Sequence, residues 1–223
     1  MLELAAAGAK VLHLRCVEYA RRFNLPIHVR SSFSPLEGTW VVENHPEGGT
    51  MEQAIIAGVA HDKSEAKVTI VGVPDRTGVA ARIFQALADN DLNIDMIVQN
   101  VSAAATGLTD ISFTLPKSDG AEATTVLKKI QGEVGFASLQ YDDSIGKLSL
   151  VGAGMRSHPG VTATFFASMA EAGVNIEMIS TSEIRISVIV REDDLERAAR
   201  AAHTAFGLDS DQNEAVVYGG TGR

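Results

Sequence analysis

Hydrophobic residues alternate with polar ones over short stretches of this chain, and longer stretches between them carry hydrophobic residues at helical spacing. Residues 68–73 alternate and are rich in β-branched side chains, which predicts a strand, whereas the apolar spacing over 78–90 predicts a helix. Two more strands are predicted at 94–101 and 111–115. A helix that starts after Ser118 is predicted at 118–130, and a closing strand at 137–141. The predicted order of elements is therefore β-α-β-β-α-β.

This order of elements occurs a second time further along the chain. Strand and helix patterns recur at 148–152, 160–172, 174–181, 184–190 and 193–206. Nine of the twenty positions 78–97 are identical to positions 160–179, including the glycine turns and the two Asn-Ile pairs. Self-similarity of this kind indicates a duplicated structural unit. The second copy lacks a closing strand directly after its last helix.

A copy of the closing strand precedes the first unit instead. Residues 56–67 align with 136–147 at a constant offset, with identities at Asp62/Asp142, Ser64/Ser144 and Lys67/Lys147. We therefore predict that the strand at 55–61 completes the sheet of the second unit, so that the first unit is inserted within the second. A strand at Val216–Tyr218 is the alternative occupant of that place, or an added edge strand.

The segment before the repeats follows a different pattern. Leu4, Val11, Leu14, Tyr19 and Phe23 share a helical period over residues 2–23, and Pro26 then forces extended structure. Short strands are predicted around Ile27–Val29 and Trp40–Val42, followed by a polar, turn-rich linker. The predicted organisation is an N-terminal segment at 1–42, a linker at 43–53, the completing strand at 54–62, a first unit at 63–143 and a second at 144–223.

Composition narrows the function classes. A net charge of -9 and a pI near 5.1 argue against nucleic-acid binding, which needs a basic surface. The single Cys16 allows no internal disulfide, which fits a reducing compartment. No apolar run approaches the roughly eighteen residues that a membrane span needs, and the first residues do not form an export signal. We expect a cytoplasmic protein that contacts no membrane.

The glycine turns at Gly78 and Gly160 are the first candidate chemistry. Each precedes a helix start, where unpaired N–H groups and a partial positive charge suit a carboxylate. Asp75, Gln99, Asn93 and Asn175 would lie near the same end of the unit and could accept hydrogen bonds from an ammonium group. The alternative is that Asp75 caps the helix and the Asn residues begin strands, and the pattern alone favours this alternative.

Other signals point to structure rather than chemistry. Gly152-Ala-Gly154 resembles the start of a dinucleotide fingerprint, but Ser157 replaces its third glycine. The histidines show no metal-ligand spacing, and we predict no metal site. We predict that His61, His158 and His203 are surface or capping residues and that Cys16 is a packed thiol. The acidic run Glu192–Asp194 is predicted to be a solvated helix start, and Met96 and Met178 are predicted to be core residues.

Several longer motifs resemble the C-terminal half of the aspartate kinase family. They are Gly8-Ala-Lys-Val-Leu, Val17-Glu-Tyr-Ala-Arg, Val29-Arg-Ser-Ser-Phe33, Asp62-Lys-Ser-Glu-Ala-Lys-Val, Asn93-Ile-Asp-Met-Ile-Val-Gln-Asn, Gly152-Ala-Gly-Met-Arg-Ser-His-Pro-Gly and Ser180-Thr-Ser-Glu-Ile-Arg-Ile-Ser. The resemblance implies an α+β fold with two interlocked ferredoxin-like βαββαβ ACT units after a short tail of an amino-acid kinase domain, residues 1–42. In actinobacteria-like members, such a chain is a separate regulatory β-subunit.

The resemblance also implies a function. The chain would be an allosteric subunit that binds L-threonine, alone or with L-lysine, at the interfaces of an ACT homodimer, and so feedback-inhibits the first step of Lys/Thr/Met biosynthesis. Its other partner would be the catalytic α-subunit, which uses ATP and Mg. The family's Lys-Phe-Gly-Gly-Thr segment is absent, so we expect no catalytic residue, cofactor or enzyme activity in this chain alone. The alternatives are a purely structural dimerisation module, or a fragment of a fused kinase that keeps part of its active site.

Carried over position by position, the resemblance implies an effector site shared by the two units. The residues are Asp75, Gly78, Val79, Asn93, Ile94, Asp95 and Gln99 in the first unit, and Val161, Thr162, Asn175, Ile176, Glu177, Ser182 and Glu183 in the second. The second glycine loop is two residues longer, with His158-Pro159 in the place of Thr77. Asp75 and Gln99 of the first unit are therefore the preferred candidates for effector binding.

Overall fold

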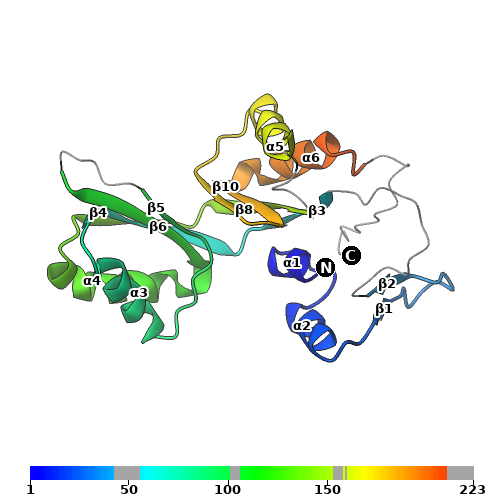
Figure 1. Cartoon of the computed structure of the whole chain (residues 1–223), viewed down its shortest axis with the longest axis horizontal. Helices are drawn as coiled ribbons and strands as arrows, with labels where there is room; N and C mark the ends of the chain where they lie inside the picture. Colours follow the sequence, from blue (N-terminus) through cyan, green and yellow to red (C-terminus); the bar gives the residue numbers. More distant parts are fainter. Residues whose placement is uncertain (43–55, 101–105, 153–157, 159, 210–223) are drawn as a thin grey trace.

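The computed structural model describes residues 1–42, 56–100, 106–152, 158 and 160–209. It contains an N-terminal segment and two α+β units, which follow one another along the long axis of the molecule (Figure 1). The predicted linker at 43–53 and the alternative strand at Val216–Tyr218 lie outside the described residues.

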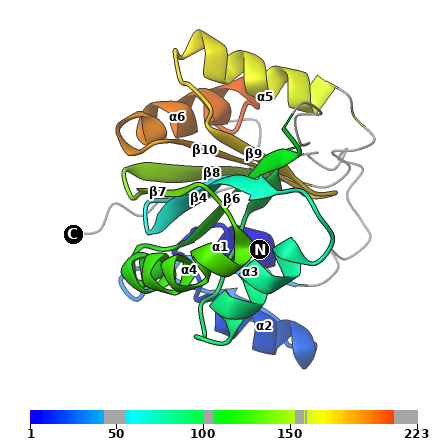
Figure 2. The ribbon, with the colours of Figure 1, turned by 90° about the vertical axis from the view of Figure 1, so that its left-hand side faces the viewer.

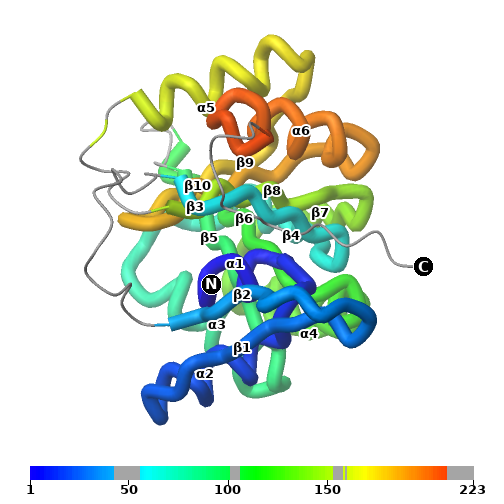
Figure 3. The backbone as a smooth tube through the Cα atoms, turned by 90° about the vertical axis from the view of Figure 1, so that its right-hand side faces the viewer, coloured from blue at the N-terminus to red at the C-terminus, as the bar shows by residue number. Residues whose placement is uncertain are grey.

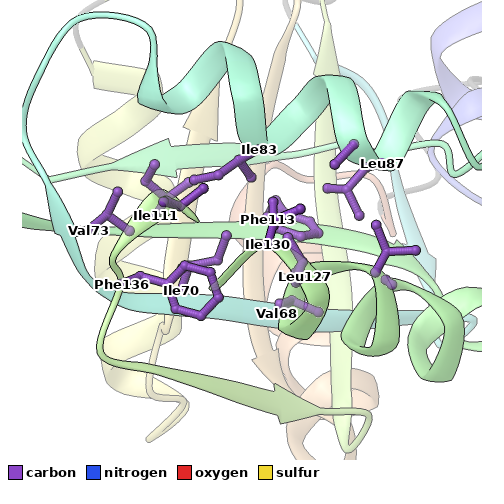
Figure 4. Packing of buried hydrophobic residues seen from close by; sticks show 14 of the residues in the cluster. Val68, Ile70, Val73, Ile83, Leu87, Ile111, Phe113, Leu127, Ile130 and Phe136 are labelled. Atoms are coloured by element: carbon purple, nitrogen blue, oxygen red, sulfur yellow. The ribbon is translucent and has the colours of Figure 1, made fainter. Parts of the chain in front are cut away.

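The first unit has the predicted β-α-β-β-α-β order. Its elements are β4 (Glu65–Pro74), α3 (Val79–Ala88), β5 (Ile97–Gln99), β6 (Leu108–Pro116), the short turn η1 (Lys117–Asp119), α4 (Gly120–Val134) and β7 (Ser138–Asp142). The antiparallel sheet has the order β5-β6-β4-β7. Alternate residues of β4, such as Val68 and Ile70, face α3 and α4 and pack with Phe113, Ile83 and Leu127 in a buried core (Figure 4).

The second unit repeats this order with one exchange. Its elements are β8 (Ile145–Gly152), α5 (Gly160–Glu171), β9 (Met178–Thr181), β10 (Arg185–Arg191), the turn η3 (Glu192–Asp194) and α6 (Leu195–Ala205). The sheet order is β3-β8-β10-β9, in which β3 (Ile56–Asp62) takes the place that β7 holds in the first unit. The predicted insertion of the first unit within the second is therefore present in the structure.

The constant sequence offset reappears in the strand register. Asp62 of β3 lies opposite Lys147 of β8, as Asp142 of β7 lies opposite Lys67 of β4. In both units the aspartate accepts a hydrogen bond from the backbone N–H of the serine two residues later. The two sheets lie back to back, with α5 and α6 outside one and α3 and α4 outside the other (Figure 2).

A small apolar cluster joins the two sheets. Met96, Ile145, Met178 and Ile189 are buried together, with Val98 packed against them. Met96 and Met178 occupy equivalent places in the repeat, and their prediction as core residues is confirmed. This cluster marks the part of the faces not covered by α3–α6 that becomes buried when the two units meet.

The N-terminal segment does not contain the single helical run that was predicted. It forms two helices, α1 (Leu2–Ala6) and α2 (Leu14–Arg22), followed by the hairpin β1 (Ile27–Val29) and β2 (Thr39–Val41). The single helical run over 2–23 is wrong because Gly8 has a left-handed φ of 105°. A Cβ atom there would lie 2.6 Å from the carbonyl oxygen of His61, so a larger residue would separate the segment from β3.

Helix α1 attaches the N-terminal segment to the second unit. Leu4 of α1 and its C-cap residue Ala7 pack on Ala60 of β3 and Val151 of β8, where Figure 3 shows α1 beside β3. Helix α2 buries only Val17, and the thiol of Cys16 is exposed. The prediction of a packed thiol is therefore wrong, because Cys16 lies outside the single buried position of this short helix.

Candidate functional site

The glycine turn of the first unit is open to solvent. Gly78 is the N-cap of α3 with a φ of 92°, and a Cβ atom built on it would meet no described atom within 4 Å. Among the described residues no side chain caps this helix, so the alternative role of Asp75 as a cap is wrong for this structure. Asp75 is exposed, and its backbone N–H donates to the Gly107 carbonyl at 2.9 Å. The helix start can therefore receive a ligand carboxylate.

The corresponding part of the second unit is described only in part, because residues 153–157 and 159 lie outside the described residues. Helix α5 begins at Gly160, with Val161 buried and Thr162 exposed. The β9–β10 turn, which carries Ser182 and Glu183, lies at the same end, because the N–H of Gly152 donates to the Ile184 carbonyl. Val161, Thr162, Ser182 and Glu183 are thus brought to one end of their unit.

The Asn-Ile segments lie at the opposite end. The N–H of Asp95 donates to the Thr114 carbonyl at 3.0 Å, and Thr114 lies opposite Lys67 near the start of β4. Gly78 follows the far end of that strand, and the ten residues of α3 span about 15 Å. The expectation that Asp75 and Asn93 share one end of a unit is wrong, because a helix that returns along a strand starts and ends at opposite ends of the sheet.

The remaining candidates fit this division. Asn93 and Asn175 precede β5 and β9 rather than begin them, with Ile94 and Ile176 half-buried beside them. Val79 is the buried first residue of α3. Gln99 is exposed on β5, opposite Ile111, between the two ends. Within one chain the candidates therefore form a group at the glycine turns and a group at the Asn-Ile loops.

The Asn-Ile loops contact the other unit through charged pairs. The ammonium of Lys147, on β8, donates to Asp95 at 2.7 Å and also to Glu65. The ammonium of Lys67, on β4, donates to Glu177. These lysines are equivalent in the repeat, and so are Asp95 and Glu177. The offset that aligns Lys67 with Lys147 was the available sequence signal, but the contacts of these lysines were not predicted.

Further charged pairs join the units along the same boundary. Lys117 donates to Glu192 at 2.9 Å and Arg191 donates to Asp142 at 2.6 Å. Lys117 hydrogen-bonds to Glu192 and thereby lowers the pKa of this carboxyl group. The acidic run at Glu192–Asp194, predicted as a solvated helix start, therefore also contributes Glu192 to the boundary between the units.

Burial and charge oppose each other at Lys147. Its side chain is only 2% exposed, which disfavours the charged form, but the Glu65 and Asp95 carboxylates outweigh this effect and raise its pKa above the ordinary value. The other oxygen of Glu65, Oε2, is buried and has no hydrogen-bond partner among the described residues. Lys147 is thus a charged group fixed between two carboxylates.

Two negative observations hold for the described residues. No group of His, Cys, Asp and Glu side chains there is arranged to hold a metal ion. In the same part of the chain, no helix combines the length and apolarity needed to cross a membrane.

Comparison with known proteins identifies the units. The family model of the ACT domain matches residues 68–131 and 148–206, one match in each unit. The aspartokinase of Mycolicibacterium smegmatis is 60% identical over all 223 residues, and that of Corynebacterium glutamicum is 57% identical over the same length. The chain spans about half, 52%, of each of these curated relatives.

Two solved structures match almost over their whole length. A chain of the aspartokinase alpha and beta subunits is 46% identical, with a TM-score of 0.64, and the match covers 68% of this chain and 99% of that one. The regulatory subunit of aspartate kinase from Thermus flavus is 41% identical, with a TM-score of 0.65 and the same two coverages.

Proposed function

This chain belongs to the aspartokinase family as its C-terminal regulatory half with two ACT domains, and on that premise we propose that it is a cytoplasmic amino-acid sensor. It binds L-threonine, alone or with L-lysine, and the bound effector lowers the phosphorylation of aspartate by the catalytic part of the kinase. The observation that supports this role most directly is the open turn at Gly78, where no side chain caps the helix and the exposed carboxylate of Asp75 lies three residues earlier. A free amino acid offers one carboxylate and one ammonium group to such a pair.

The division of the candidate residues supports a site built from two chains. Asp75 and Gly78 lie at one end of a unit, and Asn93 and Asn175 lie at the other. A homodimer in which the turn of one chain meets the loop of its partner would complete the set. We propose that the effector lies at that interface, as the resemblance implies.

The N-terminal segment supports a contact with the catalytic part. Phe33 is 99% exposed, and large apolar side chains are exposed throughout residues 1–42, at Val11, Tyr19, Phe23, Leu25, Leu36, Trp40 and Val42. Exposed apolar surface of this extent marks an interaction site. We propose that the catalytic part of the kinase covers it.

Addition of L-threonine is expected to raise the melting temperature of the purified chain. At 100 times its dissociation constant, a ligand that binds only the folded state adds about 2.7 kcal/mol. For a protein of this size, that corresponds to a rise of about 5–10 °C. Thermal-shift scans with D-threonine provide the matched control. An unchanged melting temperature with both L-threonine and L-lysine would contradict sensing and would favour a structural dimerisation module.

Replacement of Asp75 or Gln99 by Ala is expected to weaken threonine binding without unfolding the chain. A hydrogen bond to a charged group contributes about 1.5–3 kcal/mol, so Asp75→Ala should raise the Kd by about tenfold to a hundredfold. Gln99→Ala, which removes a neutral amide, should have a smaller effect. Isothermal titration calorimetry measures both, with the exposed Asp193→Ala as control. Wild-type affinity in Asp75→Ala would remove this residue from the site.

A further inference from the structure

Two lysines cross the boundary between the units in a reciprocal way. Lys147 belongs to the second unit and binds Asp95 in the Asn-Ile loop of the first. Lys67 belongs to the first unit and binds Glu177 in the Asn-Ile loop of the second. Each loop is therefore held by a side chain that the other unit supplies.

Both contacts are partly shielded from water, although the Asp95 side chain itself is 37% exposed. The side chains of Lys147 and Lys67 are 2% and 20% exposed, and the apolar cluster of Met96, Ile145, Met178 and Ile189 lies at the same boundary. Charged pairs that are shielded from water attract each other more strongly than surface pairs. The position of each loop therefore depends on the position of a lysine across the boundary.

Backbone hydrogen bonds connect these two contacts into a closed ring. The N–H of Asp95 donates to the carbonyl of Thr114, which lies opposite Lys67 in the register of β6 and β4. The N–H of Glu177 donates to the carbonyl of Ile189, which lies opposite Lys147 in the register of β10 and β8. A shift of either loop is thus passed through one lysine to the strand pair that holds the other loop.

We propose that Lys67 and Lys147 are positioning residues that lock the two Asn-Ile loops, 93–95 and 175–177, into one reciprocal unit. Neither lysine needs to touch the effector. When an effector binds one loop and shifts its position, the ring transmits this shift to the other loop and alters the affinity of that loop for the effector. That second step rests on the proposed function, whereas the crossed positioning of the loops does not.

The two halves of the ring differ in strength. Lys147 also binds a second carboxylate, that of Glu65. The residue equivalent to Glu65 in the second unit is the apolar Ile145, so Lys67 has no such second partner there. Removal of Lys147 alone would leave Glu65 as an unpaired buried charge, so the variant for this half is the double substitution Glu65→Gln/Lys147→Met. Lys67→Met leaves Glu177 with Arg191 at 3.7 Å as its remaining partner, and this single substitution tests the other half independently.

Amide hydrogen exchange, read by NMR, tests the crossed positioning. Lys67→Met is expected to accelerate exchange of the Glu177 amide by about tenfold or more, and to change the Asp95 amide less. Glu65→Gln/Lys147→Met is expected to give the reverse pattern. Lys128→Met, an exposed change on α4, should alter neither amide. A larger effect of Lys67→Met on the Asp95 amide than on the Glu177 amide, or equal effects on both amides in both variants, would overturn the proposal.

Threonine titration separates this inference from the proposed function. If the wild-type chain binds threonine, Lys67→Met is expected to raise the Kd at least fivefold while the melting temperature of the free chain changes by less than in Glu65→Gln/Lys147→Met. An unchanged Kd in both variants would overturn the coupling. If the wild-type chain binds no amino acid, the proposed function fails, and the exchange pattern alone decides whether the lysines position the loops.

Discussion

A chain that begins at residue 63 is expected to keep its first unit folded and to lose the ordered structure of the second. Such a chain lacks β3, which adds Ile56 to the second core and covers the edge of β8. Burial of a side chain of this size contributes about 1.5–3 kcal/mol, and the strand hydrogen bonds add to it. Together these losses are a large share of the roughly 5–15 kcal/mol that stabilises an ordinary domain.

Amide protection in the two units measures this result. Residues 65–142 should keep slow exchange, whereas residues 145–205 should exchange as an unfolded chain does. A chain that begins at residue 54 is the matched control, because it also lacks α1 but keeps β3. Retained protection of the second unit in the shorter chain would show that β3 is dispensable.

Replacement of Lys147 alone by Met is expected to lower the free energy of unfolding by about 3–5 kcal/mol. The substitution leaves Glu65 buried without its partner and removes the ion pair with Asp95, and loss of one member of a buried pair costs about this much. Urea denaturation measures the change, with Lys128→Met as the exposed control. The double variant Glu65→Gln/Lys147→Met should recover part of the loss. A loss below about 1 kcal/mol would mean that water solvates the ammonium group of Lys147.

The strand and helix order could be predicted from the sequence because hydrophobic periodicity reports which face of an element is buried. The exchange of β3 for β7 was predictable for a different reason. The Asp-x-Ser turns at Asp62 and Asp142 are separated along the sequence by the same number of residues as Lys67 and Lys147. The strand register keeps this equivalence, because β3 pairs with β8 as β7 pairs with β4. The break at Gly8 was not visible, because an isolated glycine in a helical pattern does not reveal a close approach to β3.

The site was predicted less completely than the fold. In an alternating strand, Lys147 falls on the face that the helices leave uncovered, which favours a solvated side chain. Around Lys147 that face is buried because the second sheet meets the first, and local patterns carry no information on how two units pack. Asp75 and Asn93 were predicted together for a different reason: both flank α3, but the ten residues of this helix place its two ends at opposite ends of the sheet.

The insertion of the first unit has a consequence for the order of folding. Strands β3 and β8 are separated by more than eighty residues, and closure of such a long loop carries an entropic cost. Pairing of Lys67 with Asp142 in the first unit brings residue 62 beside residue 147. Once the first unit has folded, β3 and β8 are joined as if by a short hairpin. The first unit should therefore fold early, and the second should form around it with the kinetics of a local event.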